Sequence, residues 1–181
     1  FRSWIGLLKN YHEIEKEKRE ELLIQLRKMN MYVVKLSEDS YFKLRRMISS
    51  ILEPFFHYIS LSNNTNWKNF EELWNTFKEF NELTAKAVSA NLTDNSLVFL
   101  HDYHLLLTAS FIYNTPNFNK QKKNFSIGLF IHSAFPSHDI FRRFPYREDM
   151  LKAMMNCSVI GFHTFDLSRN FLTNCKRLLS I

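Results

Sequence analysis

The chain has 181 residues, of which 45% are hydrophobic, and its formal net charge at pH 7 is +6. This length allows one domain with a sizeable core, and the apolar content excludes a disordered chain. The basic residues are spread along the sequence without an aromatic-rich stripe, and the longest apolar runs fall short of the roughly 20 residues that span a bilayer. We therefore expect neither a nucleic-acid partner nor a membrane partner.

The first half of the chain is predicted to be mainly helical. Residues 13–29 have leucines on one side and charged residues elsewhere, which is typical of a surface helix. Residues 31–36 form a predicted strand. Ser37, followed by two acids, is a plausible N-cap of a second helix, which we expect to end near Pro54. Aromatic and leucine side chains recur at helical spacing over 67–90, predicting a long amphipathic helix.

The second half alternates short apolar runs with helical patterns. Such alternation is typical of an α/β fold in which parallel strands are joined by right-handed crossovers. Because the runs are almost entirely apolar, we expect strands that are buried on both faces of the sheet. We find neither a linker nor a repeat, so residues 1–181 are predicted to form a single domain. The predicted strands are 96–100, 126–131 and 158–162, and the predicted helices are 103–113, 148–155 and 166–179, with a short helix near Ile140.

Two of the apolar runs end directly at a histidine. His101 follows 96–100, and His132 follows 127–131; His163 repeats the pattern more weakly after the next strand. Ligands of open α/β sheets bind beyond the carboxyl ends of the strands. The positions of His101 and His132 therefore predict a polar site at that edge.

The residues around these histidines allow more than one interpretation. Asp102 lies where a strand becomes a helix, so it fits a helix cap as well as a functional carboxylate. His101, His104 and His132 could together bind a metal, but the neighbouring sequence lacks a zincin-type Glu and a nearby Cys. The chain also lacks a glycine-rich phosphate loop. We expect no metal and no cofactor.

Three arginines, Arg142, Arg143 and Arg147, flank a proline. Arginine is well suited to bidentate phosphate contact, but solvated helix faces are the favoured explanation of these residues. The two cysteines, Cys157 and Cys175, show no CxxC spacing and no disulfide framework. We therefore expect a reducing, cytoplasmic location.

The motifs around the histidines resemble those of the trehalose-6-phosphate synthase family, glycosyltransferase family 20. Its members are retaining glycosyltransferases with the two-domain GT-B architecture, and they transfer glucose from UDP-glucose to glucose 6-phosphate. The resemblance covers nearly the whole chain and is most specific over 96–176. The matching strings are HDYHL at 101–105, HSAFPSHDIFR at 132–142, RE at 147–148 and IGFHTFD at 160–166, with weaker matches at 1–6 and 54–58.

The resemblance implies roles for three residues. Asp102 would hydrogen-bond the acceptor sugar, His132 would contact the donor glucose near its 6-hydroxyl, and Trp4 would help to line the acceptor pocket. Asp102 and His132 are thus the predicted catalytic residues. The resemblance also implies a Rossmann-like parallel sheet flanked by helices, the amino-terminal, acceptor-side half of a GT-B enzyme. The nucleotide-sugar domain would lie beyond Ile181, so we expect this piece alone to be inactive.

Two positions depart from the family pattern. Leu44 and Glu53 stand where the family has a Tyr and a Trp that contact the phosphorylated acceptor, and a carboxylate would repel that phosphate. Two hypotheses follow. The chain belongs to an active synthase, as a homo-oligomer or in a trehalose-synthesis complex, or it belongs to an inactive homologue that regulates or scaffolds such a complex.

Overall fold

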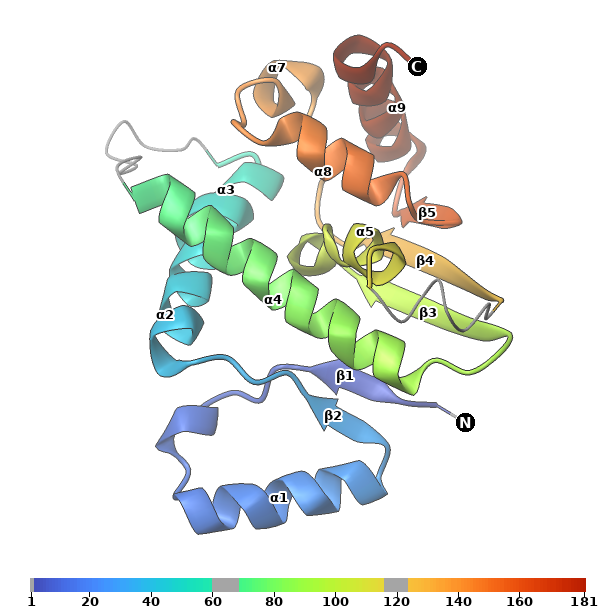
Figure 1. Cartoon of the computed structure of the whole chain (residues 1–181). Helices are drawn as coiled ribbons and strands as arrows, with labels where there is room; N and C mark the ends of the chain where they lie inside the picture. Colours follow the sequence, from blue (N-terminus) through green and yellow to red (C-terminus); the bar gives the residue numbers. More distant parts are fainter. Residues whose placement is uncertain (1, 60–68, 116–123) are drawn as a thin grey trace.

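The computed structural model describes residues 2–59, 69–115 and 124–181, which form two parallel sheets with helices packed around them (Figure 1). The strands are β1 (Trp4–Gly6), β2 (Met31–Val33), β3 (Ser96–His101), β4 (Phe125–Ile131) and β5 (Val159–Phe162). The helices are α1 (Lys16–Lys28), α2 (Glu38–Met47), α3 (Glu53–Phe56), α4 (Phe70–Asn91), α5 (Thr108–Tyr113), α7 (His138–Phe141), α8 (Arg147–Met154) and α9 (Phe165–Leu179). None of the helices described is long and apolar enough to cross a membrane.

The strands pair in parallel throughout, as the alternation of elements predicts. β3, β4 and β5 form one sheet in that order, with His101 opposite Phe130 and Ile131 opposite Phe162. β1 and β2 form a second, two-stranded sheet. The prediction lacks β1, because three residues are too short to give a recognisable period-2 pattern. The expected strand at 31–36 is also shorter, ending at Val33.

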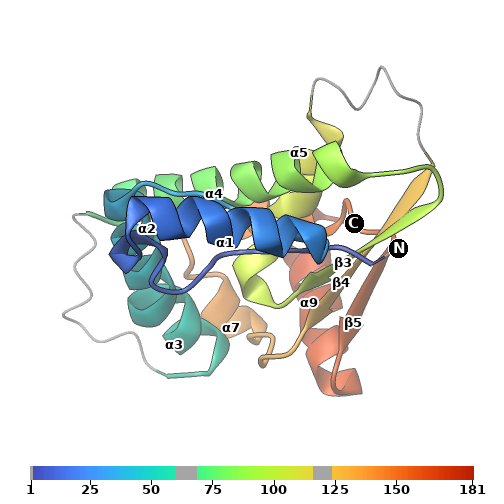
Figure 2. The same ribbon diagram turned by 90° about the horizontal axis from the view of Figure 1, so that it is seen from below.

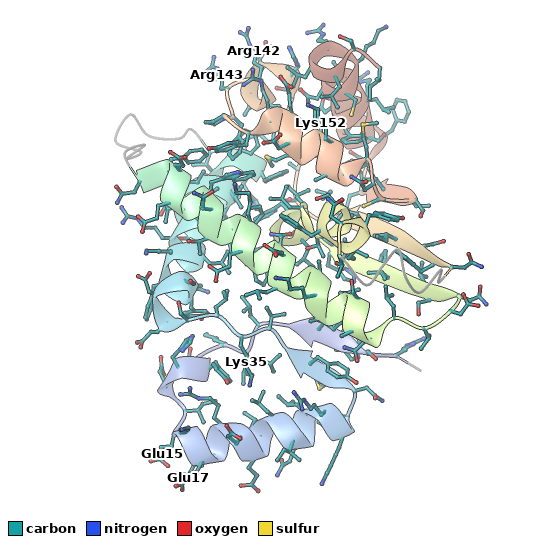
Figure 3. All side chains as sticks on the ribbon, in the orientation of Figure 1. Glu15, Glu17, Lys35, Arg142, Arg143 and Lys152 are labelled. Carbon is teal, nitrogen blue, oxygen red and sulfur yellow. The ribbon has the colours of Figure 1, made fainter. Side chains whose placement is uncertain are left out.

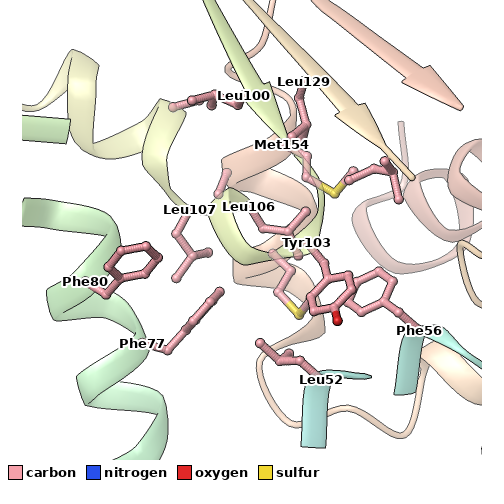
Figure 4. Packing of buried hydrophobic residues seen from close by; sticks show 14 of the residues in the cluster. Leu52, Phe56, Phe77, Phe80, Leu100, Tyr103, Leu106, Leu107, Leu129 and Met154 are labelled. Atoms are coloured by element: carbon pink, nitrogen blue, oxygen red, sulfur yellow. The ribbon is translucent and has the colours of Figure 1, made fainter. Parts of the chain in front are cut away.

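One face of the three-stranded sheet packs into the hydrophobic core. Figure 2 shows α4 and α5 lying to one side of these strands. Leu100, Ile127 and Leu129 are buried on this face. In Figure 4 the side chains of Leu100 and Leu129 lie beside those from the helices and turns that cover the sheet. The core of the domain therefore lies between this face and the helices.

The opposite face of the same sheet is exposed, so the prediction of strands buried on both faces is wrong. Leu97 is 74% exposed, Phe99 is 55% exposed and Val159 is 67% exposed. The described helices pack against the other face and leave these alternate side chains uncovered. The apolar runs reflect a sheet with two apolar faces, as is typical of parallel sheets, but only one is covered here.

On this side of the sheet, two aromatic rings each lie close to a glycine of the next strand. A Cβ on Gly128 would lie 3.1 Å from the ring of Phe99, and a Cβ on Gly161 would lie 2.6 Å from the ring of Phe130. Glycine is thus required at 161 by the close approach of the ring. The same two rings contact the histidines at the strand ends, Phe99 with His101 and Phe130 with His132.

The helix that begins after Ser37 continues past Pro54. The Ser37 hydroxyl accepts a hydrogen bond from the backbone N–H of Ser40 at 3.0 Å, so the predicted cap is confirmed. After Met47 the chain makes a π turn, Ile48–Leu52, and then α3 ends at Phe56, two residues beyond the proline. A π turn is wider than an α-helical turn. The ring of Pro54 therefore avoids the clash with the carbonyl four residues earlier that a proline causes inside an α-helix. The prediction of an end near Pro54 was therefore two residues short.

Candidate functional site

The carboxyl ends of β3 and β4 bring their two histidines into contact. The Nδ1 atom of His101 lies 3.1 Å from the Nε2 atom of His132, and their rings stack with centroids 5.4 Å apart. The ring of His163, at the end of β5, lies 5.6 Å from that of His132. The prediction that these strand ends form one polar cluster is confirmed.

Asp102 has a backbone conformation that strongly favours glycine. Its φ is 64° and its ψ is 177°, a region in which a side chain is strained by about 1–3 kcal/mol. Its carboxylate compensates locally, since Oδ1 accepts hydrogen bonds from the backbone N–H of Tyr103 at 3.0 Å and of Ser133 at 3.3 Å. Asp102 caps a short 3₁₀ turn, Tyr103–Leu105, so the cap interpretation holds. A helix cap alone requires neither this backbone strain nor the hydrogen bond from Ser133, which lies just after β4.

Ser133 completes this cluster, and the sequence interpretation did not include it. Its hydroxyl donates to Oδ1 of Asp102 at 2.9 Å, and the residue is 7% exposed. Among the described residues, Oδ2 of Asp102 has no hydrogen-bond partner, so it is available to a ligand. The signal in the sequence was positional, because Ser133 follows His132 just as Asp102 follows His101 on the adjacent strand.

A buried asparagine of α4 holds the turn that carries Asp102. Asn81 is fully buried, and its Nδ2 donates to the carbonyls of Phe77 and His104 at 3.0 and 3.2 Å. Its Oδ1 accepts from the backbone N–H of Leu107 at 3.2 Å and from the hydroxyl of Thr108 at 2.7 Å. A polar residue within the apolar stripe of a helix was the available signal for this support.

The loop after His132 is held from α9. Asn170 Nδ2 donates to the carbonyl of Phe135 at 3.0 Å, and the Tyr58 hydroxyl donates to the same carbonyl at 2.9 Å. One turn further along α9, Asn174 Nδ2 donates to the carbonyl of Pro136 at 3.1 Å. The positions of both strand ends are therefore fixed by side-chain amides from helices.

The charges around the site are negative. Burial, together with the nearby carboxylates of Asp102 and Glu53, raises the pKa of Tyr103 to about 12. Burial lowers the pKa of His104, while the same two carboxylates oppose that shift. Glu53 therefore lies close enough to Tyr103 and His104 to influence both, and it is exposed. Leu44, the other departure from the family pattern, is only 1% exposed and belongs to the core.

The remaining predicted residues lie apart from this cluster. Trp4 opens β1 and is 63% exposed, and its role in the acceptor pocket stays a prediction. Figure 3 places Arg142 and Arg143 at the α7 end of the molecule, where both are exposed. In the part of the chain that the structure describes, no group of three potential ligands could hold a metal ion.

The fold and the clustered side chains together define an open α/β domain with a candidate ligand site at the carboxyl edge of a parallel sheet. Comparison with known families makes this more specific. The model of glycosyltransferase family 20 matches residues 1–181, and the chain belongs to that family. The prediction of the amino-terminal half of a GT-B glycosyltransferase is confirmed by the solved structures described below.

Several curated relatives are named UDP-forming alpha,alpha-trehalose-phosphate synthases. The 56 kDa subunit from Kluyveromyces lactis is 35% identical over 99% of this chain and 35% of its own length. The Dictyostelium discoideum synthase A is 37% identical over 99% of this chain and 23% of its own length. The Emericella nidulans synthase is 40% identical over 74% of this chain and 25% of its own length. The chain therefore spans about a quarter to a third of these relatives.

Two solved structures show the same fold. The amino-terminal domain of a trehalose-6-phosphate phosphatase from Candida albicans is similar with a TM-score of 0.79 and 26% identity, over 97% of this chain and 36% of that one. An Escherichia coli protein described as bound with UDP-2-fluoro glucose is similar with a TM-score of 0.68 and 27% identity, over 82% of this chain and 32% of that one.

Proposed function

We propose that this chain is the acceptor-side domain of a retaining, UDP-forming trehalose-phosphate synthase. The reaction would transfer glucose from UDP-glucose to glucose 6-phosphate. The observation that carries this proposal is the strained Asp102, held by Ser133 with its Oδ2 left open beside the paired histidines. The names of the curated relatives and the UDP-2-fluoro glucose complex of a similar structure support the same donor and reaction.

The two predicted catalytic residues would have separate tasks. Oδ2 of Asp102 would accept a hydrogen bond from a hydroxyl of the acceptor sugar and thereby orient it. His132, on the neighbouring strand, would contact the donor glucose near its 6-hydroxyl. Retaining transfer through an oxocarbenium-like centre depends on positioning two sugars closely and on preorganised polar groups, which rigid strand ends supply. The other wall of the cleft would come from the nucleotide-sugar domain, outside residues 1–181.

The proposal is tested with the full-length protein. UDP-glucose and glucose 6-phosphate should together give UDP release, and either sugar alone should not. Asp102→Asn keeps an oxygen acceptor for Ser133 but removes the charge, and we expect it to lower turnover by about 100-fold or more. His132→Leu should reduce turnover comparably. Absence of UDP release from the wild-type protein with any hexose or hexose phosphate would overturn the proposal.

A second candidate function is that of a non-catalytic homologue within a trehalose-synthesis complex. Glu53 favours it, because its carboxylate, which lies near enough to Tyr103 to act on its pKa, disfavours an anionic acceptor. The similarity to a domain of a trehalose-6-phosphate phosphatase also favours it. In this case the full-length protein would release no UDP alone but would copurify with, and alter the activity of, an active synthase. Light scattering would measure the mass of the full-length protein in solution and so identify a homo-oligomer.

We further propose a cytoplasmic location. Cys157 and Cys175 are both free, and burial raises the pKa of the Cys157 thiol to about 11, so that this thiol remains protonated and unreactive. Free, unreactive cysteines fit a reducing compartment. Cell fractionation tests this location, and recovery of the protein in a secreted fraction would contradict it.

A further inference from the structure

The imidazole rings of His101 and His132 are hydrogen-bonded to each other, and each packs against the aromatic ring of a phenylalanine. The ring edge of Phe99 meets His101 with centroids 4.5 Å apart, and Phe130 lies 4.7 Å from His132. Among the described residues, neither imidazole makes another hydrogen bond. The pair is therefore held in place by packing while one nitrogen of His132 remains open.

A hydrogen bond between two imidazoles has a strict chemical requirement. One nitrogen donates and the other accepts, so the bond fails when both rings are protonated. In a neutral ring, the nitrogen that faces away has the opposite role from the nitrogen in the bond. If Nε2 of His132 accepts from His101, then Nδ1 of His132 must donate to whatever approaches it. If Nε2 donates, Nδ1 must accept.

We infer that His101 is a positioning residue that orients the ring of His132 and decides whether its open nitrogen donates or accepts toward the donor sugar. This inference rests on the proposed function, in which His132 contacts that sugar. Other groups facing the pair make no comparable link. His163 of β5 touches His132 only through ring contact, and the Oδ1 of Asp102 is occupied by Ser133.

The test compares two replacements of His101 in the full-length protein. The side-chain amide of His101→Asn can occupy the place of Nδ1, so we expect turnover within about threefold of wild type. His101→Leu fills similar space without a hydrogen bond, and we expect about a 100-fold fall in kcat, the scale on which misplaced contacts reduce rates. His12→Leu is the control, because it removes an imidazole whose ring contacts, with Tyr11 and Tyr41, lie outside this cluster.

A double-variant comparison separates positioning from a general structural role. If His101 acts through His132, His101→Leu should cause no further loss in a His132→Leu background. Additive losses in the double variant would overturn the inference. Equal activities of His101→Asn and His101→Leu would also overturn it.

A spectroscopic readout makes the inference independent of turnover. Histidine labelled with ¹⁵N reports which ring nitrogen carries the proton, and we expect the tautomer population of His132 to change in His101→Leu but not in His12→Leu. An unchanged population in His101→Leu would overturn the inference, even in an active enzyme. Absence of UDP release from the wild type, by contrast, would overturn the proposed function.

Discussion

The hydroxyl of Ser133 donates to the Oδ1 atom of Asp102 across the ends of two neighbouring strands, at 2.9 Å. With the His101–His132 pair, this bond gives β3 and β4 two cross-strand links at consecutive positions. The two links differ in burial, because Ser133 is buried whereas both histidines are exposed. The carboxylate of Asp102 is thus held from the interior through Oδ1, while Oδ2 has no hydrogen-bond partner among the described residues.

We expect Ser133→Ala to weaken both the fold and the site. Its hydroxyl bonds an ionised group, and loss of such a bond costs about 1.5–3 kcal/mol. Asp102 would then lose its hydroxyl donor and move more freely, raising KM for the acceptor. The control is Ser110→Ala, whose hydroxyl bonds only the carbonyl of Leu107, at a cost of about 1 kcal/mol. Urea denaturation and UDP-release kinetics measure the two effects. Equal losses in both variants would contradict this role of Ser133.

Asn81→Ala should be among the most destabilising single changes in the domain. It leaves buried partners in the turn after β3 without hydrogen bonds, and we expect a loss of about 2–4 kcal/mol in the free energy of unfolding. Asn91 lies on the same helix but donates only to the carbonyl of Ala87. Asn91→Ala should therefore cost about 1 kcal/mol or less. Chemical denaturation measures the stability of both variants. Similar losses of stability would contradict the role of Asn81 in holding the turn after β3.

Stability should fall with acidification partly because of His104. Burial lowers the pKa of His104 in the folded protein, so around its ordinary pKa of about 6.5 the unfolded chain binds more protons. The free energy of unfolding therefore decreases as the pH falls below about 6.5. His104→Gln should reduce this slope between pH 7 and pH 5, measured by urea denaturation, while the comparison at pH 8 serves as the baseline. An unchanged slope would contradict the assignment.

Removing the charge of Glu53 should favour a phosphorylated acceptor. Glu53 lies near enough to Tyr103 to affect its pKa, together with Asp102, so it adds negative charge to the acceptor side. We expect Glu53→Gln to lower KM for glucose 6-phosphate by several-fold and to leave KM for UDP-glucose unchanged, with the effect shrinking in high salt. The control is Glu71→Gln, at an exposed position in the first turn of α4. An equal change in both variants would point to general surface charge.

The sequence predicts where the strands lie along the chain better than it predicts which elements pack together. The apolar runs that became β3, β4 and β5 are correctly placed because each is long enough to show its pattern. β1 is too short for that, and it pairs with β2 at residues that lie 27 positions further along the chain, Trp4 opposite Met31. The exposure of Leu97 and Phe99 also depends on which helices reach the sheet. Local pattern carries no information about that tertiary arrangement.

The same division applies to the site. His101, Asp102 and His132 could be identified because each directly follows an apolar run, which places it at a known edge of the sheet. The contributions of Ser133 and Asn81 are tertiary, since Ser133 is 31 residues and Asn81 21 residues from Asp102 in the chain. The strain at Asp102 is likewise a property of the folded turn. The sequence thus places these three side chains at one edge of the sheet, whereas the residues that support them are visible only in the structure.

The uncovered face of the three-stranded sheet has a practical consequence for handling the protein. Leu97, Phe99 and Val159 form an apolar surface on strands that, in parallel sheets, are ordinarily covered on both sides. Residues 1–181 expressed alone would present this surface to solvent, and such surfaces promote self-association. Low solubility of residues 1–181 would therefore follow from this apolar surface, and would carry no information about whether the domain is correctly folded.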